Sequence, residues 1–222
     1  MAEVDQKLEP FRLRNHAALL ITFDGLDGSG KTTQIMILEE RLRKLGCAVK
    51  TTSDLNSSKI GRRIKEIVNS SSTSSDKVSD LLLIHAARTI NLQEEILPAL
   101  SSGKVVISDR FQASTYAYNF VGRGAPAPLY YSLEENILDT VSPALQIILD
   151  IGVSRKNERI LKRGGVVEKY EKMGHAYFEK VRQAFWDYAA KHGAVVLDAS
   201  QDRDSLSETI FDLVNQRLIK DD

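Results

Sequence analysis

A glycine-rich segment carries the strongest chemical signal in this sequence. Residues 25–32 read GLDGSGKT and match the pattern G-x-x-x-x-G-K-[ST] in full. Glycines let a backbone wrap around a phosphate and aim N–H groups at it, and a helix that begins there adds partial positive charge. Lys31 would reach the β- and γ-phosphates, and the Thr32 hydroxyl would bind Mg2+. We expect the ATP-binding residues to be Gly25, Leu26, Asp27, Gly28, Ser29, Gly30, Lys31, Thr32 and Thr33.

The alternative, a glycine-rich turn with a solvated lysine, is disfavoured because an apolar run precedes the segment and a helical pattern follows it. The motif alone does not separate an ATPase, a GTPase, a kinase and a motor. The sequence has no Asn-Lys-x-Asp signature for guanine recognition, which counts against a small GTPase.

A second polar pair, Asp109 and Arg110, directly follows another apolar run. Ligands of parallel sheets bind outside the carboxyl ends of the strands, so we expect this pair at the phosphate site. Asp109 could hold Mg2+ or its waters, and Arg110 could bind an acceptor phosphate through two N–H groups. A surface salt bridge at the end of a strand is the alternative interpretation.

Three arginines, Arg155, Arg159 and Arg163, are spaced to share one face of a helix, and a possible hinge at 164–165 follows them. Phosphoryl transfer needs cations around the moving group, and arginine supplies them in a planar fork. A solvated helix face explains the same spacing, so both interpretations stay open.

Alternating strands and helices must position these groups. Short apolar runs predict five strands, at 18–23, 48–52, 104–108, 145–150 and 194–198. Periodic apolar residues predict helices at 32–45, 60–68, 78–100, 134–141, 155–163, 175–191 and 205–219. This alternation is typical of an α/β fold, with a parallel sheet of about five strands flanked by helices. Trp186 is expected in the core.

Length and composition limit the class of protein. The 222 residues fit one domain at 18–222, after a polar leader at 1–17 that we expect to be disordered. Thirty basic and thirty acidic residues balance, so nothing in the net charge favours a nucleic-acid polymer or an anionic membrane as partner. The single Cys47 excludes an intrachain disulfide framework, and no apolar run reaches the roughly 20 residues of a membrane helix. We expect a cytoplasmic protein.

Considered together, the motifs resemble the thymidylate kinase family of P-loop nucleoside monophosphate kinases. The resemblance runs from about Leu19 to the C-terminus. It rests on the phosphate loop and, in family order, on the segments 86–88 (AAR), 97–100 (LPAL), 109–111 (DRF), 114–118 (STYAY) and 122–124 (GRG). It implies a P-loop kinase fold with a short lid at about 153–170, transfer of phosphate from ATP to dTMP, Mg2+ as cofactor and a homodimer.

The resemblance also implies roles for single residues. Arg88 resembles the arginine that binds the thymine base, and Tyr118 resembles the ring that lies where a ribose 2′-hydroxyl would project. Catalytic roles are implied for Lys31, Arg110, Arg159, Arg163 and Asp27, and metal binding for Thr32 and Asp109. The implied substrate-binding residues are Asp27, Asp54, Arg88, Arg110, Ser114, Thr115, Tyr118, Asn119, Glu168 and Tyr170.

One loop position and two departures from the family pattern also bear on function. Gly28 lies where some members have an arginine in the loop, which implies that the lid arginines supply that charge. Residues 54–59 differ from the usual Glu-Pro-Gly-Gly-Thr segment, and Asn119 replaces a common glutamine, so these two departures concern acceptor specificity. A kinase for deoxynucleosides or another small acceptor, and a nucleotide-binding regulator without turnover, are the alternatives.

Overall fold

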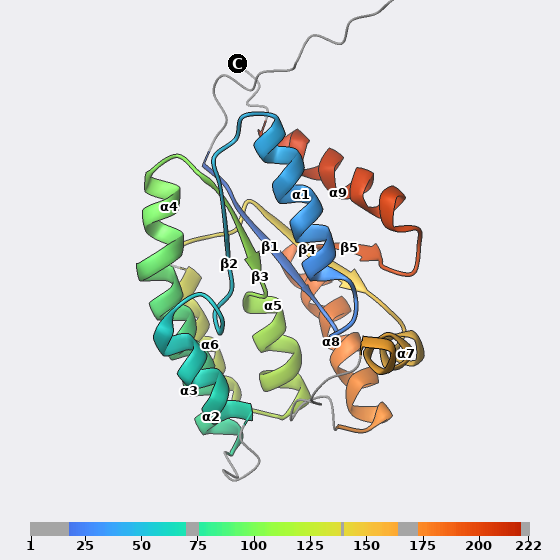
Figure 1. Cartoon of the computed structure of the whole chain (residues 1–222). Helices are drawn as coiled ribbons and strands as arrows, with labels where there is room; N and C mark the ends of the chain where they lie inside the picture. Colours follow the sequence, from blue (N-terminus) through green and yellow to red (C-terminus); the bar gives the residue numbers. More distant parts are fainter. Residues whose placement is uncertain (1–17, 70–75, 139, 164–172, 219–222) are drawn as a thin grey trace, which may run out of the picture.

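The computed structural model describes residues 18–69, 76–138, 140–163 and 173–218. Its centre is a sheet of five parallel strands in the order β2-β3-β1-β4-β5 (Figure 1). The strands are β1 (Leu20–Gly25), β2 (Val49–Thr52), β3 (Val105–Asp109), β4 (Leu145–Asp150) and β5 (Val195–Asp198). All five predicted strands are confirmed, with their ends within two residues. The predicted α/β class is therefore correct.

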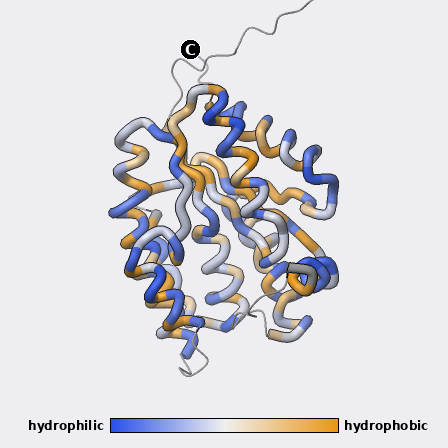
Figure 2. The backbone as a smooth tube through the Cα atoms, in the orientation of Figure 1, coloured by the Kyte–Doolittle hydropathy of each residue, from blue (hydrophilic) through white to orange (hydrophobic). Residues whose placement is uncertain are grey.

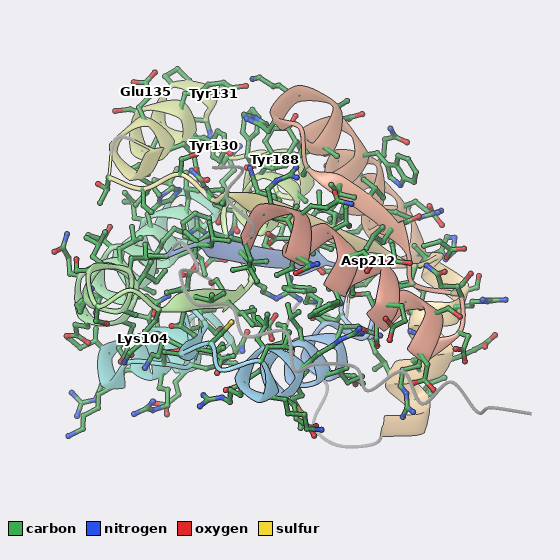
Figure 3. The ribbon with its side chains drawn as sticks, turned by 90° about the horizontal axis from the view of Figure 1, so that it is seen from above. Lys104, Tyr130, Tyr131, Glu135, Tyr188 and Asp212 are labelled. Carbon is green, nitrogen blue, oxygen red and sulfur yellow. The ribbon has the colours of Figure 1, made fainter. Side chains whose placement is uncertain are left out.

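The central strand explains why these segments read as apolar runs. Every residue of β1 is buried, and Thr22 of β1 lies opposite Ser108 of β3 and Gln146 of β4. Helix α1 (Lys31–Lys44) covers one face of the sheet, and α8 (His175–His192) covers the other (Figures 1 and 3). A strand covered on both faces needs apolar side chains on both. Figure 2 shows the hydrophobic residues gathered along these strands.

The remaining helices surround this sheet. They are α2 (Lys59–Asn69), α3 (Lys77–Asn91), α4 (Leu97–Ser101), α5 (Gln112–Ser114), α6 (Ala127–Leu138), α7 (Val153–Arg163) and α9 (Arg203–Leu218). Two π-helical segments, η1 (Leu92–Ile96) and η2 (Thr115–Gly122), join α3 to α4 and continue α5. None of the helices in the described ranges is long and apolar enough to cross a membrane.

The helix predicted at 78–100 is continuous, but its hydrogen-bond pattern changes along its length: α3 is followed directly by η1 and then by α4. Pro98 lies in the first turn of α4, directly after the π-helical segment η1. Proline has no N–H to donate and its ring crowds the preceding turn, and a wider π turn relieves that crowding. Sequence periodicity therefore predicted the length of the helix and missed its local geometry.

Three expectations about helices were incomplete or wrong. No helix was predicted over α5 and η2, because π geometry does not follow the 3.6-residue period. Helix α6 begins at Ala127 rather than 134, since Pro128 is tolerated in a first turn. Trp186 is 47% exposed, so its predicted burial is wrong. The buried stripe of α8 runs through Val181, Phe185 and Tyr188, and Trp186 lies beside it.

Candidate active site

One cavity of about 740 Å3 collects the motifs at the carboxyl ends of β1, β2 and β3. The phosphate loop lines one part of it, and residues after β2, on α3 and on η2 line another. The predicted site residues in its lining are Asp27, Gly28, Ser29, Gly30, Lys31, Thr32, Thr33, Asp54, Arg88, Asp109, Arg110, Ser114, Thr115, Tyr118, Asn119 and Arg159. The sequence therefore identified a set of residues that the fold brings to one place.

The phosphate loop has the backbone that its glycines predict. Gly25 has φ +131°, and a Cβ there would lie 2.3 Å from the Leu149 carbonyl oxygen, so only glycine fits. Gly30, with φ +95°, directly precedes α1. Nζ of Lys31 donates to the carbonyl oxygens of Gly25 at 3.1 Å and Leu26 at 3.0 Å. Burial, with Arg110 nearby, lowers the pKa of Lys31 to about 8. An anionic ligand would favour its charged form.

Arg110 connects the phosphate loop to the turn after β3. Its backbone has φ +73°, a conformation that is strained for a residue with a side chain. Nη2 donates to Oδ1 of Asp27 at 2.5 Å, and Nη1 donates to the Gly25 carbonyl and to Oγ of Ser114. Burial opposes ionisation of Asp27, but Arg110 and Lys31 outweigh it and lower the pKa of this carboxyl. Arg110 thus pairs with the loop, not with its neighbour Asp109.

Arg88 is enclosed on the opposite side of the cavity. Nε donates to Oδ2 of Asp54 at 2.9 Å, and Nη2 donates to Oγ1 of Thr115 at 2.6 Å and to the Phe111 carbonyl at 3.0 Å. Nη1 lies 3.4 Å from Oε1 of Glu134. Asp54, the acid after β2, is therefore a direct partner of the arginine that the resemblance assigns to the acceptor base.

Comparison with known proteins decides the family. The thymidylate kinase profile matches residues 23–210. Thymidylate kinase of Caulobacter vibrioides is 37% identical over 201 residues, which cover 89% of this chain and 96% of that protein. The thymidylate kinase of Deinococcus radiodurans is 33% identical, with 90% and 97% covered, and that of Magnetococcus marinus is 36% identical, with 89% and 95% covered. The chain belongs to the thymidylate kinase family. The resemblance found in the sequence is confirmed.

Gly28 lies at a position of the phosphate loop where some thymidylate kinases have an arginine. Gly28 has φ +77°, and a Cβ there would lie 3.4 Å from the Lys156 carbonyl oxygen on α7. Arg159 of α7 donates from Nη1 to the Gly28 carbonyl at 3.2 Å and from Nη2 to the Ala199 carbonyl at 3.0 Å. A guanidinium from α7 thus lies beside the loop, at the position that lacks one.

The structure describes only some of the other residues predicted to form the lid. Arg155 is exposed, donates to the Ser200 carbonyl at 3.3 Å and is not among the residues that line the cavity. The side chain of Arg163, the hinge at 164–165, Glu168 and Tyr170 lie outside the described residues. Of the three arginines, only Arg159 is placed at the phosphate loop among the side chains described.

Thr32 and Asp109, the residues predicted to bind Mg2+, have side chains that suit this ion. Oδ1 of Asp109 is buried and has no hydrogen-bond partner among the described residues. Thr32 lies in the first turn of α1, and both residues line the cavity. Carboxylate and hydroxyl oxygens are ligands that Mg2+ prefers. The described ranges contain no cluster of three or more His, Cys, Asp or Glu side chains able to hold a metal.

Sequence reasoning missed Asp24, which supports the turn after β3. Oδ1 of this buried β1 carboxylate accepts from the backbone N–H of Phe111 at 3.1 Å, from that of Ser114 at 3.0 Å and from the Ser114 hydroxyl at 2.5 Å. Asp24 thereby fixes the turn that carries Arg110. An acid inside an otherwise apolar strand was the available signal. Glu134 was also missed, because it looks like any polar residue on a helix.

Proposed function

We propose that this chain transfers the γ-phosphoryl group of ATP to dTMP, forming ADP and dTDP. The Arg110–Asp27 ion pair carries the proposal, because it joins the donor loop to the acceptor side of one cavity. Arg110 thus occupies the position where donor and acceptor phosphates would meet. Membership of the thymidylate kinase family supports both substrates.

On the donor side, the N–H groups of the loop and the first turn of α1 bind the ATP phosphates. Lys31 exchanges its loop carbonyl partners for β- and γ-oxygens. Thr32 and Asp109 would hold Mg2+, which when bound would neutralise phosphate charge. The orphaned Oδ1 of Asp109 supports this assignment.

On the acceptor side, Arg88 and Thr115 bind the base, and Ser114 and Asn119 line its edge. Tyr118 lies against the sugar. Its ring centroid is 5.3 Å from Cζ of Arg110, and its other neighbours include the ring of Phe185. Asp54 acts by holding Arg88. Asp27 lies near the sugar 3′-hydroxyl, and Glu168 and Tyr170 remain proposed contacts by family resemblance.

Catalysis then depends on position and charge. The acceptor is already an anionic phosphate, so no strong base is needed. Arg110 aligns the two phosphates, and α7 with the residues up to about 170 forms the lid that brings Arg159 or Arg163 to the transferring group.

We also propose a cytoplasmic homodimer. Family resemblance implies the dimer, and exposed apolar side chains on α2 and α3, at Ile60, Ile67 and Leu82, support a helical interface. The balanced charge gives no support to nucleic-acid polymers or membranes as partners.

A panel of nucleosides and monophosphates tests the proposal. Each acceptor is incubated with ATP, Mg2+ and the purified chain, and ADP release is measured. We expect the highest kcat/KM with dTMP. Preference for thymidine or another unphosphorylated nucleoside would favour a deoxynucleoside kinase, and ATP binding without ADP release would favour a regulator.

A further inference from the structure

Arg88 is held by two carboxylates, and only one of them touches the acceptor cavity. Asp54 lines the cavity, whereas Glu134 approaches Arg88 from α6, outside that lining. The bonds to Asp54, Glu134, Phe111 and Thr115 engage four of the five N–H groups of the guanidinium. Within the described residues, the N–H still available to a ligand is the second one on Nη1, the atom that Glu134 holds.

We propose that Glu134 is a positioning residue for the acceptor base, because its carboxyl group holds Nη1 of Arg88 and so fixes the N–H that Arg88 can offer to a ligand. This role rests on the proposed function and adds a residue to it. Glu134 does not itself contact the cavity. Its effect on the acceptor therefore passes through Arg88.

The charges around Arg88 make its interaction with Glu134 depend on whether the Glu134 carboxyl is protonated. One guanidinium faces two buried carboxyl groups, and His85 cannot supply a second cation. Nε2 of His85 lies 3.4 Å from Oε1 of Glu134, but burial, together with Arg88, lowers the pKa of His85 to about 3. Burial raises the pKa of Glu134 to about 7, although Arg88 opposes the rise. Glu134 thus changes charge within the range in which kinases are assayed.

Groups on every neighbouring element face Glu134. Besides Arg88 and His85 on α3, they are Asp24, Asp54, Gln112, Tyr130 and Tyr188. A cleft of about 110 Å3 between α6 and α8 also reaches Glu134, and its rim includes Glu135, Lys191 and His192. Figure 3 shows Tyr130 and Tyr188 between these helices and Glu135 on the outer side of α6. Glu134 thus belongs to a cleft whose lining residues are all different from those of the acceptor cavity.

An ionised carboxylate binds a guanidinium more strongly than a neutral carboxyl does. Above pH 7, ionised Glu134 holds Nη1 firmly. Below pH 7, protonated Glu134 resembles a glutamine at the same place. The role therefore predicts that a Glu134→Gln variant differs from wild type at high pH and converges with it at low pH.

The test measures KM and kcat for dTMP at pH 6.0 and 8.0 in wild type, Glu134→Gln and the matched control Glu135→Gln. Glu135 is the next residue of α6, is exposed and makes no contact with Arg88. We expect Glu134→Gln to raise KM about fivefold at pH 8.0, with kcat within twofold, and to match wild type at pH 6.0. At each pH, ionisation of the dTMP phosphate affects wild type and variant equally. It therefore cancels in the ratio of the variant KM to the wild-type KM. The control should match wild type at both pH values.

A KM ratio near one at both pH values, or an equal rise at both, would overturn the role, since the latter indicates a packing defect. Glu134→Asp provides a second reading if Glu134→Gln does not fold. Its retracted carboxylate should raise KM at pH 8.0 and lose that effect at pH 6.0. Suppose that wild type phosphorylates dTMP but the ratio of variant KM to wild-type KM is the same at both pH values. That result would refute only the role of Glu134. Failure of wild type to phosphorylate dTMP would refute the proposed function itself.

Discussion

Nη1 of Arg159 lies 3.2 Å from the carbonyl oxygen of Gly28, so a cation from α7 reaches the phosphate loop. The φ of +77° at Gly28 is unfavourable for a residue with a side chain, and a Cβ there would be in contact with α7. Loop and helix are therefore complementary: the loop carries no arginine at this position, and the helix that covers it does. This contact supports the proposal that the lid supplies charge to the transferring phosphoryl group.

Arg159→Ala should lower kcat by on the order of 100-fold while changing KM for dTMP far less, because negative charge on the transferring group is largest in the transition state. Arg159→Lys should recover little, since a point charge does not replace a bidentate fork. Arg155→Ala is the matched control on the same helix, away from the cavity, and should stay near wild type. Steady-state kinetics decide the matter. If Arg159→Ala keeps a normal kcat, the arginines form a solvated face, or Arg163 acts instead.

Lys31→Ala should lower kcat at least about 100-fold, because we propose that the ammonium binds donor oxygens whose charge grows during transfer. Lys44→Ala, at the exposed end of the same helix, serves as the control. Single-turnover rates with ATP and dTMP measure the effect. Activity within threefold of wild type would mean that the glycine-rich loop is not the catalytic phosphate site.

Tyr118→Ala should narrow the preference for deoxyribose acceptors, because we propose that the ring occupies space that a 2′-hydroxyl would need. Some general loss of activity is expected, since the ring also packs on Phe185. The measured quantity is the ratio of kcat/KM for dTMP to that for the corresponding ribonucleotide. An unchanged ratio would assign the discrimination to another residue.

The free energy of unfolding should depend on pH through Glu134. Its pKa rises from 4.5 to about 7 on folding, so the folded chain binds a proton more tightly than the unfolded chain. Stability is therefore lost as pH rises from about 4.5 to 7, by about 3 kcal/mol at 1.36 kcal/mol per pKa unit. Glu134→Gln should be less sensitive to pH in this window. Denaturation curves at pH 5 and pH 7.5 measure the free energy of unfolding of both proteins. An equal change in that free energy between the two pH values in wild type and in Glu134→Gln would contradict this account.

The sequence predicted the sheet and the phosphate loop well, since both depend on local signals: apolar runs end in glycine, and a helical period begins at the next residues. It could not predict η2, whose π geometry has no simple period and which carries Tyr118. Nor could it predict that Glu134 meets Arg88, because 46 residues separate them and only the packing of α6 on α3 joins them. Trp186 shows the reverse error, an apolar residue next to a buried stripe and not in it.

The most direct test of the whole account follows the phosphoryl group itself. Purified chain is incubated with ATP labelled at the γ-phosphate, Mg2+ and dTMP, and the nucleotides are separated by ion-exchange chromatography. The account predicts that the label appears in dTDP, at its β-phosphate, in amounts equal to the ADP formed. Label found only in inorganic phosphate, or dTMP left unlabelled while another acceptor is phosphorylated, would contradict it.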